Sequence, residues 1–122
     1  MIDGFYEETK PLTDYEEQTL LPVMVKCLQH HIGIDAAISN RAMCEALERK
    51  GYSTSETRIR KVINYIRVNG LVDCLVACSK GYYVASTRSE VQSHISSLRG
   101  REEAIRAVRN ALENQMEGMD GC

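Results

Sequence analysis

Tryptophan is absent from this chain of 122 residues, which holds one phenylalanine and two prolines. No apolar run approaches the roughly 18 residues that a membrane-spanning helix requires, so the sequence predicts no membrane association. The first ten residues include Asp3, Glu7 and Glu8 and no apolar stretch, and secretory signals need such a stretch. We therefore expect a cytoplasmic location.

Motifs for catalysis are also missing. There is no glycine-rich phosphate loop, no H-E-x-x-H and no nucleophile elbow, so the sequence predicts a non-enzyme without cofactor or small-molecule ligand. Cys27, His30 and His31 have metal-like spacing but no fourth ligand at a recognised distance. We interpret them as a core cysteine and helix-end histidines, and expect no metal site.

Five cysteines are an odd count, which does not favour a disulfide framework. On a predicted strand from Leu71 to Cys78, Cys74 and Cys78 would have Cα atoms roughly 13 Å apart, too far for a bridge. We expect free thiols.

The net charge of −2 is unevenly distributed. Residues 1–20 carry one base and six acids, and residues 117–122 carry two acids and no base, which leaves +5 on residues 21–116. A modestly basic body with acidic ends is compatible with nucleic-acid binding, although a sequence pI near 5.9 gives no support of its own.

Helix-start and helix-stop signals divide the chain. Residues 1–12 form an acidic lead-in, and residues 13–86 contain three helices and a hairpin. Thr13 with Glu16 forms a capping box, and Pro22 predicts a kink or restart. Ser39 caps a second helix that Gly51 ends, and residues 34–38 are a connection or a one-residue third strand. Residues 87–116 form a helical extension with a break near Gly100, and residues 117–122 a flexible tail.

The stretch from Ser53 to Ala85 is the most informative. Ser53 and Glu56 fit a capping box, and Ile59, Val62, Ile63 and Ile66 then recur at helical spacing. Gly70 is a natural left-handed helix end. Alternation in residues 71–78 and 82–85, around Lys80-Gly81, predicts a β-hairpin.

This order resembles the winged helix-turn-helix superfamily, over about residues 13–86. The specific likeness is to biotin-repressor-type DNA-binding domains and to small winged-helix proteins of phages and mobile elements. Its carriers are Ser39-Asn40-Arg41, Arg60-Lys61-Val62-Ile63 and Lys80-Gly81-Tyr82-Tyr83. The resemblance implies a mainly α fold with a small hairpin, and binding of double-stranded DNA in transcription regulation.

The DNA-contacting residues would then come from the third helix and the wing. Thr57, Lys61 and Asn64 would approach bases; Arg58, Arg60 and Arg67 would grip phosphates; Lys80 would steady the wing, and Arg41 would touch the backbone. Weakened binding in a variant lacking Arg60 and Lys61 is the expected result. The alternative without DNA binding is that the polar residues of the third helix form an ordinary solvent-exposed face of an amphipathic helix. Lys80 would then be a turn lysine that favours solubility.

The C-terminal helix leaves two possibilities open. Its apolar residues either cover the domain or pair with a second copy through Ile105, Leu112 and Met116. Glu102 and Arg109 interrupt the apolar spacing and argue against a long uninterrupted zipper. The alternative function is a winged-helix protein–protein interaction module without DNA binding, for which the C-terminal helix would be the working surface.

Overall fold

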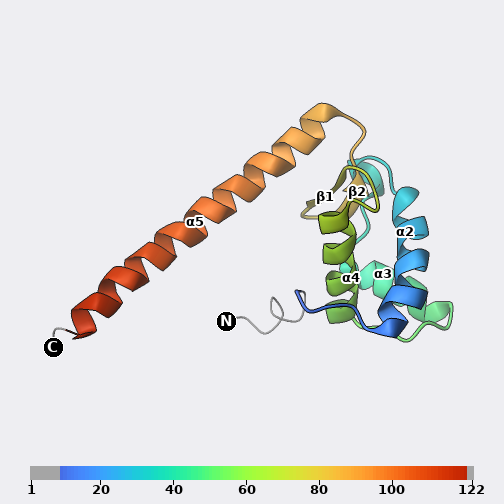
Figure 1. Cartoon of the computed structure of the whole chain (residues 1–122). Coiled ribbons are helices and arrows are strands. Elements are labelled where there is room, and N and C mark those ends of the chain that lie inside the picture. Colours follow the sequence, from blue (N-terminus) through green and yellow to red (C-terminus); the bar gives the residue numbers. More distant parts are fainter. Residues whose placement is uncertain (1–8, 121–122) are drawn as a thin grey trace.

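The computed structural model describes residues 9–120, and they form a mainly helical protein with one small hairpin (Figure 1). In chain order the elements are η1 (Glu16–Leu20), α2 (Leu21–Gln29), η2 (Ile34–Ala36), α3 (Asn40–Arg49), α4 (Glu56–Asn69), β1 (Leu75–Cys78), β2 (Gly81–Val84) and α5 (Arg88–Asp120). Helices α2, α3 and α4 pack together with the hairpin, and α5 leaves this body as a long arm.

The first helical segment begins with the predicted capping box. The Thr13 N–H donates to Glu16 Oε1 at 2.8 Å, and the Glu16 N–H donates to Thr13 Oγ1 at 3.2 Å. Pro22 has no N–H for an ordinary helical bond, and the chain passes through the π-helical turn η1 before α2 starts with Pro22 in its first turn. The sequence predicts a kink or restart here, and the structure has a change of helix type with no gap between η1 and α2.

Helix α4 begins differently from the prediction. Ser55 is its N-cap, and Ser55 Oγ accepts from the Arg58 N–H at 3.2 Å. Glu56 is therefore the first helical residue, and the predicted box with Ser53 is wrong; the Ser53 carbonyl instead accepts from the Tyr15 hydroxyl at 2.8 Å. The other end is as expected, since Gly70 adopts φ 62° as a left-handed C-cap.

The hairpin is shorter than the alternation indicated. β1 and β2 pair antiparallel from Leu75↔Val84 to Cys78↔Gly81. Residues 71–74 form a turn because the chain must reverse after Gly70, and Cys74 takes φ 58°. Placing Cys74 on the strand was therefore wrong. Ile38 bridges Tyr82, which confirms the one-residue third strand.

The core lies between α2, α3, α4 and β1. The predicted apolar stripe of α4 is buried, and it meets the stripes of the other helices. The largest fully buried side chains are Leu20, Met24, Leu28, Met43, Ile59, Ile63, Ile66 and Val62. Cys27, Cys44, Cys74 and Cys78 carry free thiols, and burial raises the pKa of Cys44 to about 11.

Helix α5 is a single helix of 33 residues, about 50 Å long. Thr87 and Glu90 form the predicted capping box at its start. The predicted break at Gly100 is wrong, since the roughly 1 kcal/mol that glycine costs does not end so long a helix. Helix also continues through residues 117–120, where the sequence predicts a flexible tail, and residues 121–122 of that tail lie outside the described residues. Among residues 9–120, no helix has the length and apolar character needed to cross a membrane.

Candidate nucleic-acid interface

Helix α4 follows α3 after a short turn, residues 50–55. The Tyr52 N–H donates to the Leu47 carbonyl at 3.0 Å, and Gly51 takes φ 92°, so the chain reverses at once. The two helices pack together through their apolar faces. In this arrangement the side chain of Thr57, in the first turn of α4, is exposed to solvent.

A buried ion pair removes Lys61 from the candidate interface. Lys61 Nζ lies 2.7 Å from Glu16 Oε1, and the two side chains are 9% and 3% exposed. The prediction that Lys61 approaches bases is wrong. Helix position had placed this side chain outward, but the N-terminal helical segment covers it.

Arg58 is held by the same carboxylate. Its Nε donates to Glu16 Oε2 at 2.9 Å, and its guanidinium lies 5.3 Å from the centre of the Tyr15 ring. The side chain is 35% exposed. A phosphate contact by Arg58 stays a prediction, and this guanidinium would have to leave or share the Glu16 carboxylate to make it.

Glu16 is charged in this cluster. Burial raises the pKa of its carboxyl, but the hydrogen bonds from Lys61, from the Thr13 N–H and from Arg58 together lower it below its ordinary value. The Glu16, Lys61 and Arg58 cluster therefore fastens the N-terminal segment to α4. Its role is structural.

Arg67 lies at the junction of α4 and α5. Its Nη2 donates to His94 Nε2 at 2.7 Å, and it shares a groove with Asn64, Val68, Ile95 and Leu98. Burial, followed by the charges of Arg67 and Arg101, lowers the pKa of His94 and favours the neutral ring that accepts this bond. The structure thus directs the Arg67 side chain to α5, and its predicted phosphate contact stays a prediction.

Three of the predicted contacts lie at the N-terminal half of α4 and the hairpin. Thr57 is exposed, and Arg60 Nη2 donates to Thr57 Oγ1 at 3.4 Å. Lys80 is exposed at the hairpin tip. Asn64, half-buried, lies further along α4 where the groove with α5 begins.

Lys80 and Arg41 line one shallow hollow with Ser39 and Glu56. Arg41 Nε pairs with Glu45 Oε1 at 3.2 Å, and both side chains are well exposed. An exposed pair of this kind contributes little to stability and is screened by salt. The hollow therefore offers two cations beside one carboxylate.

The metal-like spacing near the end of α2 does not assemble a site. Cys27 Sγ and His31 Nε2 lie 3.8 Å apart, and His31 Nδ1 is 2.8 Å from the Ala36 carbonyl. Within residues 9–120, no group of three or more His, Cys, Asp or Glu side chains is placed to hold a metal ion.

Sequence reasoning missed the two partners that decide this surface, Glu16 and His94. The capping box predicts a local role for Glu16, and no local signal indicates that its carboxylate also reaches α4. In comparisons with known proteins, no family model, no curated protein and no solved structure matches the chain.

Proposed function

We propose that residues 13–86 form a winged helix-turn-helix domain that binds duplex DNA through the N-terminal half of α4 and the hairpin tip. The observation that carries the proposal is the placement of the exposed Thr57 and the half-buried Arg60 side by side near the start of α4, after a tight turn from α3. Recognition helices of this class contact base edges with their N-terminal residues.

The proposed contacts are fewer than the sequence suggested. Arg60 supplies the central cation, able to pair with guanine or a phosphate, and Thr57 supplies a hydroxyl beside it. Lys80 and Arg41 line a neighbouring hollow that reaches α4 at Glu56, and Asn64 marks the far limit because the groove between α4 and α5 begins there. With so few cations, one copy binds DNA with modest affinity.

The test is fluorescence anisotropy of a mixed-sequence duplex, titrated in salt. Arg60→Ala is expected to weaken binding about tenfold and to reduce the slope of log K against log salt by about 0.9, the value for one lost phosphate contact. Arg99→Ala removes the same charge from an exposed site on α5 and serves as the matched control.

Equal binding by Arg60→Ala, Arg99→Ala and the unaltered protein would contradict the proposed interface. Lys61 variants are unsuitable for this purpose, because they disturb the buried pair with Glu16 and confuse lost stability with lost contacts.

The second candidate function is protein–protein interaction without DNA binding, and the exposed apolar side chains of α5 favour it. Seven of the twelve large apolar side chains that are exposed among the described residues lie on this helix. If assembly is the whole function, the duplex does not bind at low salt, and substitutions on α5 have larger effects than Arg60→Ala.

A further inference from the structure

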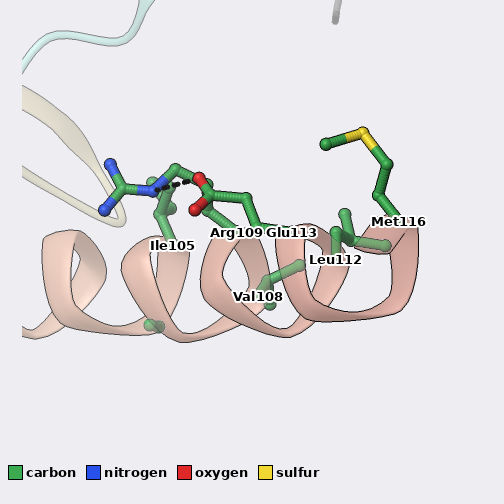
Figure 2. A pocket seen from close by; sticks show the side chains of 7 residues that line it. Ile105, Val108, Arg109, Leu112, Glu113 and Met116 are labelled. Atoms are coloured by element: carbon green, nitrogen blue, oxygen red, sulfur yellow. Dashed lines mark ion pairs between the residues drawn. The ribbon is translucent and has the colours of Figure 1, made fainter. Parts of the chain in front are cut away.

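One face of α5 carries an apolar stripe, interrupted by Glu102 and Arg109, whose large side chains are exposed in the described part of the chain. Its large residues are between 37% and 74% exposed. They are Ile95, Leu98, Ile105, Val108, Leu112, Met116 and Met119. Figure 2 shows the middle of this stripe, where Arg109 and Glu113 pair along its edge.

Such a face is unusual for a protein that remains a single copy, because contiguous apolar surface of this extent marks an interaction site. At its N-terminal end the stripe continues into the groove beside α4, where Val68 is 76% exposed. The apolar surface thus extends from the domain along the arm.

We propose that α5 pairs antiparallel with α5 of a second copy. Leu98, Ile105, Leu112 and Met119 recur every seven residues, which is the repeat of a two-helix seam. Ile95 and Met116 occupy the intervening seam positions near the two ends, while Glu102 and Arg109 occupy those in the middle.

The two charged seam residues select the direction. A parallel, in-register pair would set Glu102 against Glu102 and Arg109 against Arg109, and like charges facing each other in a seam are destabilising. An antiparallel pair centred at residue 107 brings Glu102 of each copy within about one helical turn of Arg109 of the other. Glu102 is then level with Leu112 of the other copy, and Arg109 with its Ile105. Like charges therefore no longer face each other, and each Glu102 lies about one turn from an Arg109.

The same alignment also matches the ends. Ile95 becomes level with Met119 of the second copy, and Leu98 with its Met116. The exposed C-terminal methionines therefore reach the open groove beside Val68. Methionine suits such an irregular groove, because its unbranched side chain adapts to the available shape. This pairing does not depend on DNA binding.

The first experiment measures the mass of the full chain in solution by light scattering and sedimentation over a concentration series. The unaltered protein is expected to have twice the 13.7 kDa monomer mass, and Leu112→Glu the monomer mass. Leu112 is 58% exposed, so the variant keeps its fold, which circular dichroism checks. Ala107→Glu adds the same charge to the opposite face and is expected to remain dimeric.

A monomeric unaltered protein, or a dimer that Leu112→Glu leaves intact, would overturn the pairing. A charge exchange tests its direction. Glu102→Arg and Arg109→Glu should each weaken the dimer about tenfold, because each changes two symmetric contacts, and the double exchange should restore it. Equal dimer affinities for the unaltered protein, both single variants and the double variant would overturn the antiparallel arrangement.

Discussion

Replacing Glu16 by glutamine tests whether the buried cluster holds the domain together. Glutamine keeps the size of the side chain and can still accept from the Thr13 N–H, but it removes the charge. The Lys61 ammonium, in a side chain that is 9% exposed, then has no carboxylate partner. Arg58 loses the same partner, although its greater exposure allows water to compensate.

Removing one partner of a buried ion pair typically costs about 3–5 kcal/mol, mostly because the other charge stays buried. Since the amide oxygen retains hydrogen bonds, we expect about 3 kcal/mol for Glu16→Gln. That is a large part of the roughly 5–15 kcal/mol that stabilises a domain of this kind. In urea it lowers the unfolding midpoint by about 1–3 M.

Urea unfolding followed by far-ultraviolet circular dichroism measures this change. Glu17→Gln is the matched control, because Glu17 is exposed in the adjacent position and should change stability by less than about 0.5 kcal/mol. A Glu16→Gln variant as stable as this control would refute the reasoning. Combining it with Lys61→Met should recover part of the loss, since no buried charge then lacks its partner.

Three further predictions concern the pH dependence of stability and substitutions at two glycines. The pKa of the Glu16 carboxyl is lower in the folded protein than in the unfolded chain, so its contribution to stability is complete above about pH 4.5 and is lost as pH falls through the folded pKa. Below about pH 4.5 the free energy of unfolding should therefore fall less steeply with pH for Glu16→Gln than for the unaltered protein. Identical pH dependences of the two proteins would contradict this. Gly81→Ala should lower the melting temperature by on the order of 10 °C or more, because φ is +129° and the new Cβ would meet the Ile38 carbonyl oxygen at 2.2 Å. In Gly100→Ala the new Cβ has no atom within 4 Å, and the substitution should add about 1 kcal/mol of helix stability and slow hydrogen exchange in α5. If Gly81→Ala and Gly100→Ala changed stability in the same direction, the difference between the two sites would be contradicted.

Much of the local structure could be predicted from the chain because its causes lie within one helical turn. The capping boxes at Thr13 and Thr87, the cap at Ser39 and the left-handed Gly70 each depend on neighbours three or four residues away. The apolar stripe of α4 is similarly local, because helix periodicity fixes which side chains share a face.

The candidate interface depends on contacts between distant residues, and only the folded chain shows them. Glu16 meets Lys61 across 45 positions, and Arg67 meets His94 across 27. Periodicity places Lys61 on the outward side of α4, but packing of the N-terminal segment buries it there. Spacing in the sequence predicts which side chains lie on the same face of a helix. Tertiary packing decides which other element covers that face, and therefore which cations of α4 remain at the surface.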